Sequence, residues 1–406
     1  MSSAPGLPAA KSYSAATSVR AGEDARAFLR RLIFYGFLLR AALALLLDAT
    51  EYSRLLAPDE ETYAGRAWLL ALFWAGEVLI RPSWMAGGSG SGPLGYFYLN
   101  AAFFYVFGQT ELPIKLTNAF LGAFTARYVY LVTLDIFGDA VGRRAAILYM
   151  FFPSIILWST LNIRDVWVIY LILFICYKSA RLSRGYSYVG AFQLLLALYA
   201  LTFFRDYLFF AISLAPVAAL VIGRSRNFGR NLVLAILVGL GIVLLLQQGV
   251  VSERGASRMS LEALSQARRD MATGDSAFHG NVDISTPLKA LLFLPIGIAY
   301  FLFAPFPWEI TSLLKALALP EMIFMYTLIP AMFRGVRYAI GHAFRDSAQL
   351  LLLTVFLTVS YALGEGNVGT LYRHRAQAVT FYLIFAAVGL ELRNRQRQRE
   401  AVALSR

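Results

Sequence analysis

Long apolar runs recur from one end of this chain to the other. Many extend for about 18 residues, which as a helix is long enough to cross roughly 30 Å of hydrocarbon. Charged residues make up only 15% of the chain, against about 25% in soluble domains, and the mean hydropathy is +0.60. So few charges cannot cover the surface of a soluble globule. The sequence therefore predicts an all-α polytopic membrane protein.

We expect about twelve transmembrane helices, within a range of roughly 10 to 13, and a surface helix in the first outer loop. The expected spans are residues 29–48, 94–108, 114–137, 144–160, 165–181, 188–204, 207–223, 231–250, 288–304, 318–333, 348–363 and 376–390.

The chain divides into one membrane domain and two short tails. We expect a disordered cytoplasmic tail at residues 1–24, a single transmembrane domain at 25–392 and a basic cytoplasmic tail at 393–406. Two long outer loops are expected at 49–92 and 251–286.

Basic residues set the expected orientation, because cytoplasmic loops are rich in lysine and arginine. The chain has a net charge of +13, and its arginines cluster before the first span and after the last. Both termini are therefore expected in the cytoplasm. The excess of arginine over lysine suggests a bacterial source, so the protein is expected in the bacterial cytoplasmic (inner) membrane. Twelve full crossings do not place every basic loop on that side, so some segments are expected to enter the membrane without crossing it. The candidates are residues 68–80, 94–108 and 308–319.

The composition also argues against several other functions. The basic excess does not form a soluble module, so nucleic-acid binding is not indicated. Cys176 is the single cysteine, so an intrachain disulfide is excluded and a cysteine-based metal site is not indicated. His279 and Asp283 form only a weak two-ligand metal pattern. No cofactor is indicated, apart from a divalent cation that acidic residues near a phosphate could bind.

Three adjacent carboxylates, Asp59, Glu60 and Glu61, follow the first expected span, with Tyr63 close behind. A carboxylate at the boundary between water and lipid could accept a proton from a hydroxyl as a general base. The alternative is that the triplet caps the surface helix, where the helix dipole favours negative charge.

Ionisable residues, most of them basic, also stand at expected outer ends of spans, against the general trend. Charged groups in such places are candidates for function, and the guanidinium fork suits phosphate because it donates two parallel hydrogen bonds. For Arg164, Asp165 and Arg205 the alternative is a turn whose own charged side chains pair with one another. The residues are Arg164, Asp165, Arg205, Arg373, His374 and Arg375.

Short motifs follow one another between about residues 30 and 160. They are Pro58-Asp59-Glu60, Gly92-Pro93-Leu94-Gly95-Tyr96, Phe107-Gly108, Lys115-Leu116, Phe137-Gly138, Arg144-Ala145 and Pro153. In this order the motifs resemble the GT-C superfamily of membrane glycosyltransferases, chiefly the protein mannosyltransferase and aminoarabinose transferase type. The resemblance implies a polyprenyl-phosphate-linked sugar donor and transfer on the outer face. It also implies that Asp59 is the catalytic base, with Glu60 as the lesser candidate.

We therefore expect a membrane glycosyltransferase that moves a hexosyl or pentosyl group to a glycan, lipid or protein acceptor of the cell envelope. Asp59 would take the proton of the acceptor, while arginines neutralise the leaving lipid phosphate and a histidine orients or protonates it. This requires the acidic triplet and the C-terminal basic cluster to line one cavity that opens on the outer face. The expected substrate-binding residues are Tyr63, Arg164, Asp165, Arg205, Arg373, His374 and Arg375.

Two alternatives stay open at this point. A polysaccharide polymerase or ligase of the O-antigen type would depend on arginine and histidine rather than on an acidic base. A transporter of lipid-linked oligosaccharides would favour charges buried in the middle of spans and inverted internal repeats.

Overall fold

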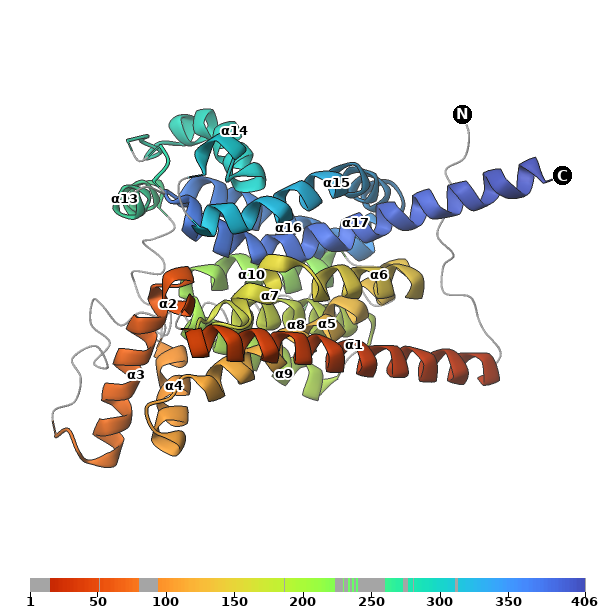
Figure 1. Ribbon diagram of the computed structural model, residues 1–406. Coiled ribbons are helices and arrows are strands. Elements are labelled where there is room, and N and C mark those ends of the chain that lie inside the picture. The colour runs from red at the N-terminus through yellow and green to blue at the C-terminus, as the bar shows by residue number, and fades with distance from the viewer. Residues whose placement is uncertain are drawn as a thin grey trace.

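The computed structural model describes residues 15–50, 52–79, 94–185, 187–222, 260–272, 277–279, 281–310 and 313–405, together with positions 229, 233, 236 and 239. Within these residues the chain is helical, without an extended strand (Figure 1). The helices are α1 (Ala15–Thr50), α2 (Tyr52–Leu56), α3 (Asp59–Ala75), α4 (Leu94–Phe107), α5 (Leu112–Phe137), α6 (Asp139–Met150), α7 (Pro153–Trp158), α8 (Asp165–Arg184), α9 (Tyr188–Phe204), α10 (Asp206–Val221), α13 (Leu261–Met271), α14 (Pro287–Phe303), α15 (Leu313–His342), α16 (Phe344–Gly364) and α17 (Val368–Leu404), with a 3₁₀ turn at Pro307–Glu309.

Five helices of the described residues are long and apolar enough to cross a membrane, which confirms a multi-pass membrane protein. The expected number of about twelve spans is not confirmed. Four further apolar helices are shorter, and the expected span 231–250 lies almost wholly outside the described residues. The five long segments are Glu23–Thr50, Leu112–Phe137, Asp165–Arg184, Phe344–Gly364 and Val368–Leu404.

The expected span 94–108 does not run with the bundle. Helix α4 has 14 residues, about 21 Å at 1.5 Å per residue, which is too short for the hydrocarbon core. It lies beside α3 at one end of the bundle, across the direction of α1 (Figure 1). Leu70 and Ala71 of α3 pack there against Ala101 and Phe104 of α4. Helix α3 lies where the sequence predicts a surface helix, and α4 packs beside it instead of forming the expected span.

The expected single span 144–160 is broken into α6 and α7. The break falls at Phe151 and Phe152, directly before Pro153. Proline has no amide hydrogen to donate and disfavours helical geometry in the residue before it, so one helix ends and a second begins.

The expected span 288–304 stays at one end of the bundle. Gly297 of α14 lies against the carbonyl of Ala362 near the end of α16. At the other end of α14, the Arg375 guanidinium donates to the carbonyl oxygen of Ala304. Both contacts lie close to the corner between α16 and α17, so α14 does not traverse the bundle. The long helix α15 begins at this end and contains the expected span 318–333.

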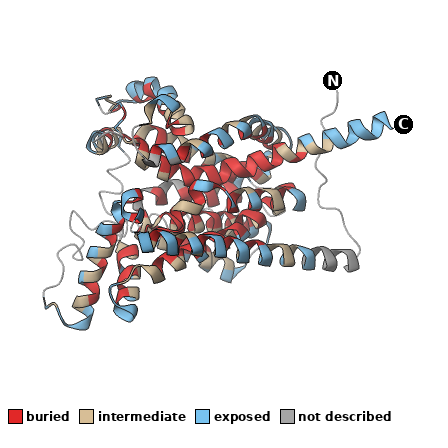
Figure 2. Cartoon of the chain, in the orientation of Figure 1, coloured by how far each residue is buried: buried red, intermediate tan, exposed pale blue. Residues whose placement is uncertain are grey.

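Helix α17 forms the centre of the bundle, and it is almost continuously buried from Val368 to Gly389 (Figure 2). Gly389 lets α15 approach closely, because a Cβ there would overlap the carbonyl of Ala331. Close backbone approach at small residues is a common means of packing membrane helices.

The basic ends of the chain lie together, at the opposite end of the bundle from α2, α3 and α13 (Figure 1). Helix α1 begins at Ala15, so residues 15–24 of the expected disordered tail are helical, and residues 1–14 lie outside the described part. Helix α17 continues through most of the expected basic tail, to Leu404. The two expected cytoplasmic tails therefore lie at the same end of the bundle, and the orientation of the protein in the membrane stays a prediction.

One charged residue inside α1 was not singled out from the sequence. Arg40 is fully buried. Its guanidinium donates to Ser159 Oγ at 3.0 Å, to the carbonyl of Met150 at 2.9 Å and to that of Gly36 at 3.1 Å. These bonds fasten α1 to the broken helix α6–α7 and satisfy the charge with neutral acceptors.

Replacing Arg40 with alanine should lower the stability of the protein. The change leaves buried acceptors unpaired, at about 1–3 kcal/mol each, and opens a cavity. The thermal midpoint in detergent should fall by several degrees. Arg31→Ala, at an exposed position of the same helix, is the control. Equal midpoints for the two variants would contradict a stabilising role for Arg40.

Candidate functional site

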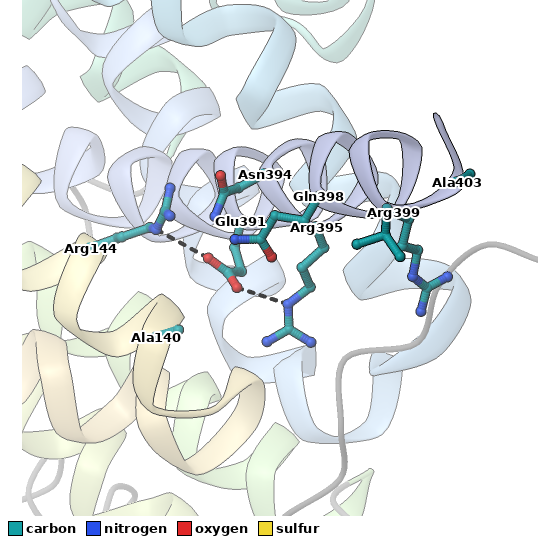
Figure 3. Close-up of a pocket in the computed structure, with 9 residues that line it drawn as sticks. Ala140, Arg144, Glu391, Asn394, Arg395, Gln398, Arg399 and Ala403 are labelled. Carbon is teal, nitrogen blue, oxygen red and sulfur yellow. Dashed lines mark hydrogen bonds and ion pairs between the residues drawn. The ribbon is translucent and has the colours of Figure 1, made fainter. Parts of the chain in front are cut away.

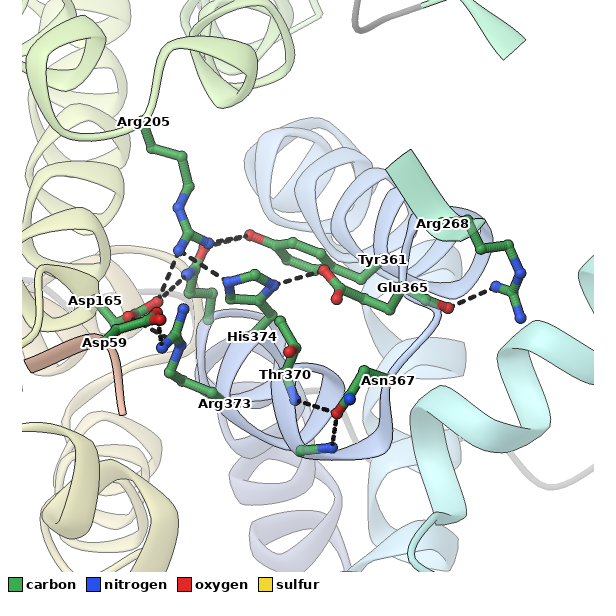
Figure 4. A network of polar contacts seen from close by, with 12 residues as sticks. Asp59, Asp165, Arg205, Arg268, Tyr361, Glu365, Asn367, Thr370, Arg373 and His374 are labelled. Carbon is green, nitrogen blue, oxygen red and sulfur yellow. Dashed lines mark hydrogen bonds and ion pairs between the residues drawn. The ribbon is translucent and has the colours of Figure 1, made fainter. Parts of the chain in front are cut away.

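Polar side chains from four places in the sequence meet at the end of the bundle where α3 begins (Figure 4). Asp59 opens α3 and Asp165 opens α8. Arg205 stands at the corner between α9 and α10. Arg373 lies near the start of α17. The structure thus brings the acidic triplet and the C-terminal basic cluster into contact.

Arg373 lies between an exposed carboxylate and a buried one. Its Nη1 atom donates to Asp59 Oδ2 at 2.6 Å, and its Nε atom is 3.5 Å from Asp165 Oδ2. The side chain of Asp59 is 51% exposed and that of Arg373 13%, whereas Asp165 is fully buried. One face of Arg373 is therefore fixed inside the protein, and its other face pairs with a carboxylate at the surface.

Below Arg373 lies a closed ring of buried polar groups. Arg205 Nη2 donates to Asp165 Oδ1 at 3.0 Å, and neither side chain is exposed. Gln377 Nε2 donates to the same oxygen at 3.0 Å. Tyr361 completes the ring, because its hydroxyl accepts from Arg205 at 3.2 Å and donates to Gln377 Oε1 at 2.6 Å. The ring joins the beginning of α8, the α9–α10 corner, α16 and α17.

The contacts of His374 fix its tautomer. The Arg205 guanidinium lies 2.9 Å from His374 Nε2, and because a guanidinium can only donate, Nε2 accepts. Nδ1 then carries the proton and donates to Glu365 Oε1 at 2.6 Å. The ring also stacks on Tyr361. With both nitrogens engaged and 8% of the side chain exposed, His374 supports Arg205 from inside the protein.

Glu365 was not chosen from the sequence, although it is the single acid in the glycine-rich segment before α17. Its side chain is buried, and burial raises the pKa of Glu365 to about 7, against the opposing effect of the Arg205 and Arg373 guanidiniums. Glu365 Oε2 has no hydrogen-bond partner among the described residues. Glu365 therefore orients His374 and can hold a proton near neutral pH.

Arg268 of α13 was also not chosen, and it braces this corner. Its Nη1 atom donates to the carbonyl of Glu365 at 2.5 Å, and its Nη2 atom donates to that of Phe278 at 3.2 Å. The guanidinium lies over the rings of Phe278 and Phe293, and burial lowers the pKa of Arg268 to about 10. Gly366 permits the contact, because a Cβ there would meet the carbonyl of Arg268.

Glu60 points away from Asp59, into the protein. It is fully buried. Glu60 Oε1 accepts from the amide of Asn162, and Oε2 is 3.8 Å from Lys115 Nζ. Burial raises the pKa of Glu60, and the Lys115 ammonium opposes this shift. Its contacts favour a role in fixing the turn before α8 over direct contact with a substrate.

Three other expected substrate-binding residues also have inward partners. Tyr63 is 5% exposed, and its ring meets that of Tyr96 edge-on at 5.1 Å. Arg164 Nη1 donates to the carbonyl of Phe204 at 2.8 Å. Arg375 is 1% exposed and donates to Met322 Sδ at 2.7 Å as well as to Ala304. The expectation that Arg375 faces a substrate needs correction. Arg375 follows Arg373 by two positions, so its side chain is rotated by about 200° around the helix and points into the protein.

The weak metal pattern does not form a site in the structure. Asp283 accepts from Lys289 Nζ at 2.6 Å and from the Ser285 amide at 2.9 Å, and these donors lower its pKa. His279 instead packs edge-on against Tyr300. In the part of the chain that the structure describes, no three histidine, cysteine, aspartate or glutamate side chains gather as metal ligands.

A comparison with protein families identifies the chain in part. Residues 91–247 match the model of the dolichyl-phosphate-mannose-protein mannosyltransferase family. This match supports the resemblance of the chain to the GT-C superfamily. Asp165 and Arg205 lie within the matched stretch, whereas Asp59 and Arg373 lie outside it.

A comparison with solved structures gives a fainter likeness. The chain is similar to the apo form of the Archaeoglobus fulgidus oligosaccharyltransferase, with 12% sequence identity and a TM-score of 0.47. The likeness covers 77% of this chain and 43% of the archaeal one, so this chain spans less than half the length of the archaeal protein. A search of curated proteins finds none that matches.

Replacing Glu365 with glutamine should change how stability depends on pH. The folded state keeps a proton on Glu365 up to about pH 7, whereas an unfolded glutamate loses it near pH ~4.3. The folded state therefore binds more protons between these values, and the stabilisation present at low pH is lost as pH rises toward 7.

The measurement is the thermal midpoint in detergent at several pH values. The midpoint of the wild type minus that of Glu365→Gln should fall between about pH 5 and pH 7. Glu400→Gln, at an exposed position, should show no such trend. A difference that stays constant or increases over this range would contradict a buried, protonated Glu365.

Proposed function

We propose that this chain transfers a sugar from a polyprenyl-phosphate-linked donor to a cell-envelope acceptor. Transfer would occur at the end of the bundle that carries α3 and α13, on the outer face of the bacterial cytoplasmic membrane. The observation that carries the proposal is the contact between Asp59 and Arg373, which places an exposed carboxylate beside a cation. The match of residues 91–247 to a family of mannosyltransferases supports the reaction type.

Arg373 is the proposed partner of the donor phosphate. Its Nε edge faces the buried Asp165, while its Nη1 atom is held by the half-exposed Asp59. An arriving phosphate would displace Asp59 and take its place on the guanidinium, which suits phosphate geometry. Binding of the donor would thereby release the carboxylate.

The released Asp59 is the proposed general base. The acceptor hydroxyl attacks the anomeric carbon while its proton passes to Asp59, and the bond from this carbon to the phosphate oxygen breaks. The phosphate keeps the electron pair, and Arg373 neutralises the charge that develops on it. A single displacement of this kind inverts the anomeric configuration. The sugar is a hexose or a pentose, and a divalent cation could assist at the phosphate.

The surroundings of His374 favour this mechanism over a polymerase or ligase that relies on arginine and histidine. A histidine that contacts substrate needs a nitrogen free for it, and both nitrogens of His374 are engaged inside the protein. The buried cation Arg40 does not favour a transporter, because neutral acceptors of neighbouring helices satisfy it.

Asp59→Asn should reduce sugar transfer by about 10²–10⁴-fold, the usual contribution of a general base. The assay uses membrane vesicles and a panel of radiolabelled polyprenyl-phosphate sugars. Glu61→Gln is the matched control, because Glu61 is an exposed acid in the same helical turn. Transfer at the wild-type rate in Asp59→Asn would end the proposed base role. If Arg373 or His374 were then essential, the polymerase alternative would be correct.

Arg373→Gln should weaken binding of a polyprenyl phosphate by about tenfold to a hundredfold, as expected for the loss of a hydrogen bond from a charged group. Asp59→Asn should bind the same lipid as tightly as the wild type or more tightly, because it removes the competing carboxylate. Native mass spectrometry of the purified protein measures both.

Arg269→Gln is the control for this binding experiment, since Arg269 is an exposed arginine of α13 at the same end of the bundle. Weaker binding in Asp59→Asn, or unchanged binding in Arg373→Gln, would show that the phosphate does not exchange with Asp59.

A further inference from the structure

A second polar region lies at the opposite end of the bundle, where α6 and α17 diverge (Figure 3). A hollow of about 980 Å³ separates the two helices there. Its charged lining consists of Arg144, Arg395 and Arg399 with the single acid Glu391. Three cations and one anion give the lining a net charge of +2. None of these residues takes part in the proposed transfer reaction.

Glu391 fixes two of the arginines in place. Its Oε2 atom is 3.1 Å from Arg144 Nε, and its Oε1 atom is 2.8 Å from Arg395 Nε. The carboxylate is 7% exposed and thus lies at the base of the hollow. It engages each guanidinium through Nε, and the described residues supply no partner for the terminal nitrogens of either arginine. Those nitrogens remain as donors for an anion.

Neutral donors and a third cation complete the site. The amides of Asn394 and Gln398 also line the hollow. Arg399 is exposed, and within the described residues it makes no hydrogen bond or ion pair. The lining therefore offers guanidinium and amide donors to one anionic group that also carries hydroxyls.

The depth of the hollow indicates where this anion comes from. Helix α17 is buried up to Glu391 and is exposed over most of its length beyond. The hollow begins where the apolar part of the helix ends, which is the level of lipid headgroups. Basic pockets between helices at the cytoplasmic boundary bind anionic headgroups.

We propose that the hollow between α6 and α17 binds the headgroup of an anionic phospholipid of the cytoplasmic leaflet. The phosphate is neutralised by the arginines that line the hollow, Arg144, Arg395 and Arg399. The hydroxyls of a glycerol headgroup accept hydrogen bonds from Asn394 and Gln398. The bound lipid bridges α6 and α17 where Glu391 already joins them.

A second basic hollow between α8 and α9 is less suited to this role. Its Arg184 already contacts Asp135, both through the carboxylate at 3.3 Å and through the carbonyl at 3.0 Å. Its Lys178 lies over the rings of Phe174 and Tyr177. The cations there have partners within the protein.

The test compares two arginines of one helix. Arg399 lines the hollow, whereas Arg397 is equally exposed, does not line it and lies about 200° away around α17. The full-length protein in detergent is titrated with phosphatidylglycerol, and bound lipid is counted by native mass spectrometry. Arg399→Gln should weaken binding of one lipid by about fivefold, and Arg397→Gln should leave it unchanged. Arg144→Gln should weaken the same binding event.

Two further arms identify the ligand. Phosphatidylcholine should not compete for this lipid, because its headgroup has no net charge. Inorganic phosphate at millimolar concentration should neither displace the lipid nor raise the thermal midpoint. Equal affinity in Arg399→Gln and Arg397→Gln would overturn the proposal. Displacement by inorganic phosphate would show instead a site for a soluble anion.

Discussion

The buried ion pair between Asp165 and Arg205 determines how the site is assembled. Its two charges are 3.0 Å apart and fully buried. Leaving either one alone inside the protein would cost about 3–5 kcal/mol, so the helix ends that carry them must meet. Gln377 donates to Asp165 and Tyr361 accepts from Arg205, which draws α16 and α17 to the same place. Arg373 then reaches Asp59 because α17 is held at that position.

Local sequence patterns predict the long helices well and the arrangement of the short ones poorly. Apolar runs of sufficient length mark the helices α5, α8 and α16, since length and composition decide whether a helix can cross. The expected spans 94–108 and 288–304 are equally apolar, but their placement depends on contacts with α3 and α16 that are distant in sequence. The break before Pro153 fits proline geometry, but proline alone does not predict it, because α10, α14 and α15 each contain a proline at which the helix continues.

The candidate site shows the same division between local and distant information. The sequence predicts that the acidic triplet and the basic cluster before the last span lie together, because the expected orientation places both groups on the outer side. Asp59 points outward and Glu60 inward because nearby residues face different sides of a helix, and the same holds for Arg373 and Arg375. The side that each residue faces cannot be assigned before the helix boundaries are known. Arg268 could not have been chosen, because the main-chain carbonyl that ties it to this corner belongs to Glu365, nearly a hundred residues further along the chain.

The two carboxylates that share Arg373 are not equivalent, and their difference determines what an incoming phosphate would displace. Separating Asp165 from its cations would leave a buried charge, at about 3–5 kcal/mol. In the pair with Asp59 the carboxylate is 51% exposed, and ion pairs that water reaches contribute about 0–1 kcal/mol. A phosphate that approaches Arg373 therefore displaces Asp59 at little cost and leaves Asp165 bound. In the proposed reaction, binding of the donor phosphate thus frees the base Asp59. The buried Asp165 keeps Arg373 in position during this exchange.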